Sequence, residues 1–153
     1  DLLVSFRQTS TVGIVDKASG EFKWKWGPGE VNHQHHPTYL DNGRVLLFDN
    51  GCHRRGASRL RIVGVDPATN QIAWEYQGTP DIPFYSYNIS SAERQPNGNT
   101  LICEGAPGRI FEVTPEKAIV WEYINPYFGD APSRGPVNSV NGEIGRASCR
   151  ERV

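Results

Sequence analysis

Hydrophobic and polar residues alternate along most of the chain in runs of five or six positions, which is the period of a half-buried strand and not of a helix. In one such run Ile72, Trp74 and Tyr76 fall on the same face. Asp, Asn, Pro and Gly, the residues that favour turns, stand between the runs. The pattern predicts strands at 2–6, 11–16, 21–26, 36–40, 44–49, 59–66, 71–76, 91–95, 99–104, 109–114 and 118–123.

One unit is written into the chain about three times. A tryptophan-centred tripeptide marks each copy, spaced by 50 and then 47 positions: Trp24-Lys25-Trp26, Trp74-Glu75-Tyr76 and Trp121-Glu122-Tyr123. A turn sequence precedes each tripeptide. A period near 50 residues with four short strands is typical of a β-propeller blade. We therefore expect an all-β fold, a partial β-propeller of roughly three four-stranded antiparallel blades, with the tryptophans packed between neighbouring sheets.

The repeat also divides the chain. We expect residues 1–142 to be a fragment of one propeller domain, with blades at about 1–26, 35–76 and 88–123 and the start of another after 124. Residues 143–153 interrupt the pattern and resemble a translated sequencing adapter, so we expect a non-native tail.

Without the three Arg and two Glu of this tail, 13 basic and 15 acidic residues remain, a net charge of −2. This balance argues against nucleic acid or an anionic membrane as partner, and no apolar run is long enough for a membrane span.

Two Asn-Gly sequences set the orientation of the strands. Asp41-Asn42-Gly43 and Pro96-Asn97-Gly98 each stand between two predicted strands and indicate type I′ hairpins, whose two central residues have positive φ. If strands alternate in direction, the short turns of every blade lie at one end of the propeller. The longer loops then lie at the other end, where functional residues usually gather.

All the histidines and three arginines fall in or beside these longer loops: His33, His35, His36, His53, Arg7, Arg54 and Arg55. The first strand of a blade lies nearest the propeller axis, so we expect His35 and His36 at the mouth of the central channel. Arg7, from the preceding blade, should lie on the same side. Imidazole supplies a nucleophile that titrates near neutrality, and guanidinium pairs with sulfate, phosphate or carboxylate. The cluster suits capture of an anionic group or attack on it.

Two other interpretations of the histidines stay open. His33, His35 and His36, together with His53, have a composition that zinc or copper accepts. No cysteine or carboxylate is interleaved among His33, His35 and His36, however. Alternatively, they are loop histidines that hydrogen-bond the backbone.

Cys52 and Cys103 stand at non-equivalent places in the repeat. They are free or paired, and two cysteines identify no redox compartment.

At these residues the chain resembles the bacterial PAPS-independent arylsulfotransferases, over most of residues 2–128. The similarity includes the Gln-His-x-Pro segment at Gln34–Pro37 and the Leu-Asp-Asn-Gly and Phe-Asp-Asn-Gly segments that follow it. It continues in the following segments: Val4-Ser5-Phe6-Arg7-Gln8, Ile89-Ser90-Ser91-Ala92-Glu93-Arg94, Pro96-Asn97-Gly98-Asn99-Thr100-Leu101-Ile102 and Phe111-Glu112-Val113-Thr114-Pro115.

The resemblance implies a six-bladed periplasmic propeller that moves a sulfuryl group from a phenolic sulfate ester to a phenol, by ping-pong transfer through a sulfohistidine and without a nucleotide cofactor. His35 matches the family's histidine nucleophile, and Arg7 matches the arginine that holds the sulfate. The family's other active-site histidines lie upstream of Arg7. His36 is expected to contact substrate, as are Ser90 and Ser91, which occupy the repeat positions of His35 and His36.

Two competing classes remain. Asp16-x-x-x-Gly20 before a tryptophan also resembles the repeat of pyrroloquinoline-quinone (PQQ) dehydrogenases, whose propellers need calcium and carboxylate ligands in the channel. Asp49 and Glu104, at the ends of equivalent strands, are the starting point for such a site. The third class is a scaffold propeller that binds partner peptides. Sulfuryl transfer that is lost with His35 would exclude both.

Overall fold

The computed structural model describes residues 1–52, 60–78, 84–131 and 135–137. The described residues form strands and one short 3-10 turn, η1. In chain order the elements are β1 (Leu2–Phe6), η1 (Arg7–Thr9), β2 (Thr11–Val15), β3 (Phe22–Trp26), β4 (His35–Tyr39), β5 (Val45–Asp49), β6 (Arg61–Asp66), β7 (Gln71–Tyr76), β8 (Ser90–Arg94), β9 (Thr100–Glu104), β10 (Arg109–Val113), β11 (Ile119–Ile124), β12 (Gly129–Ala131) and β13 (Gly135–Val137). Strands β1–β11 match the predicted ranges to within two residues; η1, β12 and β13 were not predicted.

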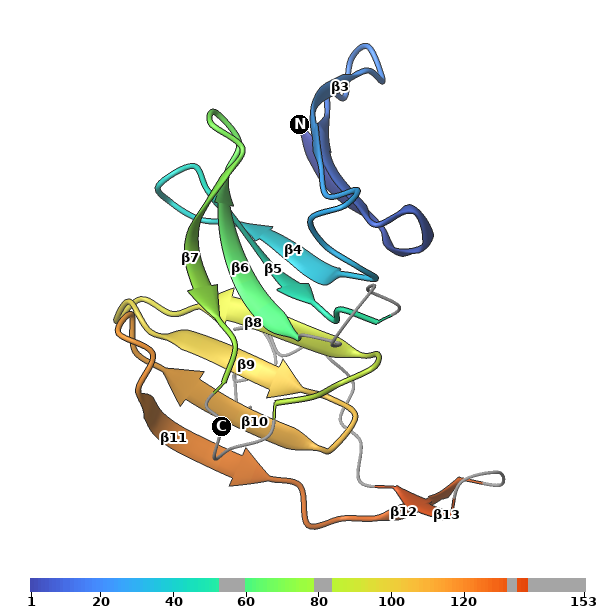
Figure 1. Ribbon diagram of the computed structural model, residues 1–153, viewed down its shortest axis with the longest axis vertical. Coiled ribbons are helices and arrows are strands. Elements are labelled where there is room, and N and C mark those ends of the chain that lie inside the picture. The colour runs from blue at the N-terminus through green and yellow to red at the C-terminus, as the bar shows by residue number, and fades with distance from the viewer. Residues whose placement is uncertain (53–59, 79–83, 132–134, 138–153) are drawn as a thin grey trace, which may run out of the picture.

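The strands assemble in chain order into three antiparallel sheets, followed by the small pair β12-β13. The sheets are β1-β2-β3, β4-β5-β6-β7 and β8-β9-β10-β11. Figure 1 shows them side by side, from the blue N-terminal sheet through the cyan and green middle sheet to the yellow and orange third sheet. This is the arrangement of consecutive propeller blades. The expected all-β partial propeller is therefore confirmed.

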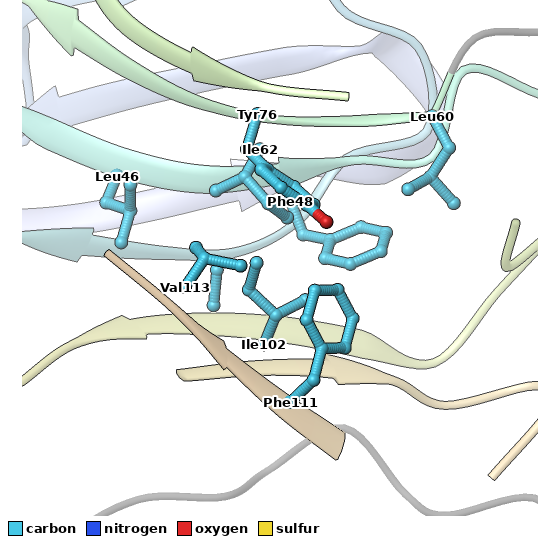
Figure 2. Packing of buried hydrophobic residues seen from close by; sticks show 9 residues of the cluster. Leu46, Phe48, Leu60, Ile62, Tyr76, Ile102, Phe111 and Val113 are labelled. Atoms are coloured by element: carbon cyan, nitrogen blue, oxygen red, sulfur yellow. The ribbon is translucent and has the colours of Figure 1, made fainter. Parts of the chain in front are cut away.

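The hydrophobic core lies between the sheets. Leu46, Phe48, Ile62 and Tyr76 of the middle sheet meet residues of the third sheet, among them Ile102, Phe111 and Val113 (Figure 2). On its other face the middle sheet meets the first sheet in a second cluster: Val12, Trp26, Val31, Val45, Leu47, Val63 and Val65. All residues of β5 are buried, because alternate side chains enter different clusters. The middle sheet is thus covered on both faces.

Trp24 and Trp74 join their sheets to the next one, as the repeat predicted, whereas Trp121 of the third sheet is 49% exposed. Trp24 Nε1 donates a hydrogen bond of 2.8 Å to Asn70 Oδ1, and Trp74 Nε1 donates one of 2.9 Å to the Pro115 carbonyl. Both acceptors lie in the turn between the third and fourth strands of the following sheet. A partly buried indole that places its one donor on a neighbouring turn helps to set the spacing between the sheets.

The hairpins lie where the Asn-Gly sequences predicted, but the expected type I′ geometry is wrong. Gly43 and Gly98 have φ of 79° and 88°, whereas Asn42 is absent from the residues with positive φ. The Gly43 amide donates to the Leu40 carbonyl, and the Leu40 amide donates to the Arg44 carbonyl. This is a type I turn followed by a left-handed glycine, the common three-residue hairpin loop. Only the glycine adopts positive φ, because it has no Cβ.

Charged side chains, largely buried on the second and third strands and more exposed on the fourth, form a ladder across the loop end of two sheets. Each ladder runs carboxylate, arginine, carboxylate over the second, third and fourth strands: Asp49–Arg61–Glu75 and Glu104–Arg109–Glu122. The last member is the glutamate of the tryptophan tripeptide. Strand pairing places Phe6, Thr11 and Lys25 at the equivalent positions of the first sheet, so that sheet has no such ladder.

The first ladder also fixes two loops. Asp49 Oδ1 accepts from the backbone amides of Asn32 (2.8 Å) and Gly51 (3.2 Å), while its Oδ2 accepts from Arg61 Nε at 2.9 Å. Arg61 also donates to the Glu30 carbonyl at 2.6 Å. The segment that leads into β4 and the segment that leaves β5 are therefore tied to one carboxylate.

We expect Arg61→Met to cost about 3–5 kcal/mol of folding free energy, because it leaves the fully buried Asp49 carboxylate without its cation. Lys23→Met is the matched control, since Lys23 pairs with Asp1 and Asp16 at a half-exposed position and should change stability little. Urea unfolding of the full-length protein measures both. Equal losses in the two variants would mean that the buried ladder does not hold the sheet.

Candidate active site

His35 and Arg7 lie at the loop end of their sheets, opposite the short turns. His35 is the first residue of β4, and Arg7 follows β1 as the first residue of η1. Burial lowers the pKa of His35 and raises the pKa of Cys52, and the positive charge of Arg7 acts to lower both, so its field reaches both side chains. No carboxylate among the described residues forms an ion pair with Arg7. The first sheet carries Phe6 where the other two carry the acid of their ladders.

Gln34 fixes the His35 segment to the preceding sheet. Its side chain is almost fully buried, and its Nε2 donates to Ser5 Oγ and to the Thr11 carbonyl, both at 3.0 Å. Ser5 belongs to β1 and Thr11 to β2, the two strands that η1 and Arg7 connect. The glutamine next to His35 therefore holds the histidine strand against the sheet from which Arg7 extends.

The backbone around His35 is strained. His33 and His36 have φ of 54° and 50°, in the left-handed region that non-glycine residues seldom occupy. Such residues cost about 1–3 kcal/mol each and persist where the surrounding structure imposes them. Pro37, which has no N–H, interrupts the pairing of β4 with β5 between His35 and Thr38. His35 thus projects from a bulged strand end held by its neighbours.

The His35 ring is half-buried and hydrogen-bonded to Asn50. The Nδ1 of His35 lies 2.6 Å from Oδ1 of Asn50, a fully buried residue that follows β5. Burial lowers the pKa of His35 below its ordinary value of 6.5; the bond to Asn50 acts in the opposite direction, and the charge of Arg7 lowers the pKa further. The imidazole is therefore neutral at pH 7. A neutral imidazole keeps a lone pair for nucleophilic attack.

His36 faces a different part of the surface. Its Nδ1 is 3.4 Å from the Ala92 carbonyl of β8. It also lines a cavity of about 470 Å³ between β4 and β8, which extends toward the short turns. The other lining residues are Thr38, Tyr39, Leu40, Asp41, Glu93, Arg94, Gln95 and Pro96. Neither His35 nor Arg7 lines this cavity, so His36 alone connects it with the predicted site.

Ser90 and Ser91 are buried at the start of β8. Ser90 Oγ donates to the Asn88 carbonyl at 3.2 Å and accepts from the Gly105 amide at 3.4 Å. Their expected equivalence to His35 and His36 is wrong by one position. Strand pairing sets His35 opposite Phe48 and Ser91 opposite Cys103, and these partners are themselves equivalent. The bulge in β4 causes the shift, and the substrate contacts of His36, Ser90 and Ser91 stay predictions.

The structure also places the two cysteines and part of the predicted metal-ligand set. Cys52 and Cys103 are free thiols, and burial raises the pKa of Cys103 to about 11. Within the described residues, no group of three His, Cys, Asp or Glu side chains is arranged to hold a metal ion. His53, Arg54 and Arg55 lie outside the described residues, so the metal arrangement that includes His53 is not tested.

The carboxylates considered as calcium ligands are already engaged. Asp49 and Glu104 have side-chain exposures of 0% and 3%, and each pairs with an arginine of its own ladder. A channel cation would have to displace Arg61 or Arg109 to reach them. The geometry of these two residues therefore does not favour a quinone site of the PQQ type.

Sequence reasoning missed Asn50, Ser86 and the anchoring role of Gln34. Asn50 and Gln34 stand within motifs that the sequence displays, but a side-chain hydrogen bond to a distant strand leaves no periodic signal. One clue was available for Asn50: it follows the second strand of its blade, as Arg7 does in the preceding blade. Ser86 lies in an irregular loop and carries no such clue.

Comparison with known proteins identifies the family. A sequence profile of the arylsulfotransferase (ASST) family matches residues 1–126. No curated protein matches the chain. A protein of unknown function from Bacteroides caccae, with a crystal structure at 1.35 Å resolution, has a similar fold with a TM-score of 0.54 and 13% sequence identity. The match covers 76% of this chain and 39% of that one. At this identity the likeness concerns the fold alone, and the chain spans about two fifths of that protein.

We expect the His35 titration midpoint to lie below 6.5 and to rise in Arg7→Gln, because removal of the nearby positive charge favours the imidazolium. NMR titration of ring protons in the full-length protein measures this, with Arg44→Gln, at the short-turn end, as control. The unfolded chain binds the proton more tightly, so the contribution of His35 to stability should be lost as pH falls through 6.5 toward the lowered value. An unchanged midpoint in Arg7→Gln would contradict the assigned electrostatics.

Proposed function

Because the chain belongs to the arylsulfotransferase family, we propose that the protein transfers a sulfuryl group from a phenolic sulfate ester to a phenol through a sulfohistidine formed on His35. In this proposal residues 1–142 are part of a single six-bladed propeller domain. The enzyme needs no 3′-phosphoadenylyl sulfate (PAPS). Its partners are the two small aromatic molecules.

One observation carries the proposal. The segment matched by the family profile contains a neutral, half-buried imidazole within the field of a guanidinium that pairs with no described carboxylate. Neutrality suits the nucleophile, and an unneutralised cation suits a sulfate ester with its negative charge. Gln34 ties the strand of His35 to the sheet from which Arg7 extends.

In the first half-reaction the His35 imidazole attacks the sulfur of the donor. A nitrogen–sulfur bond forms, the bond between sulfur and the phenolic oxygen breaks, and the electron pair leaves with the phenolate. Arg7 stabilises the negative charge on the sulfuryl oxygens, in the way that fixed cations stabilise phosphoryl groups in transfer. The donor product then leaves.

In the second half-reaction the acceptor phenol attacks the same sulfur. An oxygen–sulfur bond forms, the nitrogen–sulfur bond breaks, and its electron pair returns to the imidazole. The proton of the acceptor passes to a general base that another part of the propeller supplies. His36, Ser90 and Ser91 are proposed to contact the substrates, with His36 at the opening of the cavity between β4 and β8.

We further propose that the protein works in the periplasm or outside the cell, as expected for this family. No helix in the described part of the chain has the length and apolar character needed to cross a membrane. That finding leaves the location itself to a direct test by cell fractionation.

We expect His35→Asn to reduce acceptor-dependent release of nitrophenol from p-nitrophenyl sulfate by at least about a thousandfold, because the covalent intermediate cannot form. His36→Asn is the matched neighbour and should keep transfer with a higher KM. Activity that survives in His35→Asn but not in His36→Asn would reverse the assignment. A well-folded full-length protein that releases no nitrophenol from several donors would leave a binding propeller as the better account.

We expect Arg7→Gln to lower kcat/KM by about a hundredfold to a thousandfold, the usual loss when one donor to developing charge is removed. Arg7→Lys should recover part of this loss, since it restores the charge but not the planar fork of donors. Steady-state kinetics with varied donor measures both variants. An Arg7→Gln enzyme with the kcat/KM of the wild type would remove Arg7 from the site.

A further inference from the structure

Asn50 uses both ends of its side-chain amide inside the protein. Oδ1 lies 2.6 Å from His35 Nδ1, and Nδ2 donates a hydrogen bond of 2.8 Å to the Ser86 carbonyl. Asn50 and Ser86 have no solvent exposure. A continuous line of hydrogen bonds therefore joins the loop before β8 to the His35 ring.

The direction of this line follows from donor and acceptor chemistry. A backbone carbonyl only accepts, so the amide nitrogen of Asn50 must face Ser86 and the amide oxygen must face His35. That oxygen also only accepts, so Nδ1 of His35 must carry the ring proton in the neutral form. The lone pair then resides on Nε2, the nitrogen that makes no contact with Asn50.

The carbonyl at the start of the line is itself held in place. Ser86 Oγ donates to the Asn88 carbonyl at 2.6 Å and accepts from the Ala106 amide at 3.1 Å. Ala106 follows β9, so the loop end of the third sheet fixes the position of Ser86. The positions equivalent to Asn50 in the other sheets are Arg7 and Gly105, so this line of bonds occurs at His35 and is not repeated at those positions.

We propose that Asn50 is a positioning residue, which, oriented by the Ser86 carbonyl, holds His35 in the tautomer protonated at Nδ1 and so directs Nε2 to the sulfuryl group. The catalytic part of this statement rests on the proposed function; the tautomer does not. When the Nε2–sulfur bond forms, the ring gains positive charge while Nδ1 keeps its proton, and its hydrogen bond to Asn50 strengthens.

An amide suits this position better than a carboxylate. An aspartate would attract the imidazolium, raise the pKa of His35 and protonate the nucleophile near neutral pH. Asn50 offers the same acceptor without charge. Among the described residues, the charged group whose field acts on His35 is Arg7, from η1, and its effect is to favour the neutral ring.

The test uses full-length protein labelled with ¹⁵N in histidine, with the His35 signals assigned by their loss in His35→Asn. The ring nitrogens of the wild type should show a protonated Nδ1 and an unprotonated Nε2 at pH 8. Asn50→Ala should mix the two tautomers and lower kcat/KM by about tenfold to a hundredfold, as loss of a hydrogen bond that orients a histidine does. Asn50→Asp should raise the His35 pKa and move the acid limb of activity to higher pH. Asn97→Ala, at a short turn, is the control and should change neither property.

A wild-type His35 protonated at Nε2 would overturn the proposal without any variant. An Asn50→Ala protein that folds, keeps the tautomer and keeps its rate would overturn it also. If the wild type shows the expected tautomer but no sulfuryl transfer, the positioning of His35 stands while the proposed function fails, so the two are separable.

Discussion

The buried Asp49 carboxylate is the constraint on which the candidate site depends. It binds the amide of Asn32 just before the His33–Gln34–His35 segment, the amide of Gly51 just after Asn50, and the guanidinium of Arg61. Burial of two charges costs free energy that their attraction largely offsets, so the ladder adds little net stability to a well-packed sheet. Its effect is positional. It brings the two loops that carry His35 and Asn50 to a fixed separation, which a hydrophobic pair of the same volume would not define.

Three sheets contribute to one small site. The first supplies Arg7 and the partners of Gln34, the second supplies His35 and Asn50, and the third holds Ser86. Because each sheet buries an apolar face against the next, the sheets cannot shift relative to one another without opening a core cluster. The rigidity needed to keep a strained histidine segment and a buried amide in register therefore comes from packing that takes no part in the chemistry.

The first sheet lacks the charged ladder that the other two sheets repeat, and this difference bears on the site. Two sheets neutralise their loop-end arginine with two carboxylates, and the first sheet does not. In the first sheet, Phe6 stands at the position of the second-strand acid and Thr11 at the position of the arginine. Arg7, which follows Phe6, has no described carboxylate as partner. A scaffold that repeats an ion-paired ladder, in which each arginine meets two carboxylates, can thus carry at one position a cation with no described carboxylate partner, where an anionic substrate is proposed to bind.

The sequence by itself determined the strands, their order and the end of each sheet where the histidines lie. Alternation and turn residues are local, and tryptophans at a fixed spacing report the stacking of the sheets, so the strand limits and the roles of Trp24 and Trp74 were predictable. The resemblance pointed to His35 through Gln34–Pro37 and to Arg7 through Val4–Gln8. The tertiary structure alone decided the rest. The bulge at His36 and Pro37, the shift that sets Ser91 in the place of His35, the ladders and the line from Ser86 through Asn50 all depend on contacts between strands or sheets. Such contacts are set by packing in three dimensions, and the period of a strand carries no record of them.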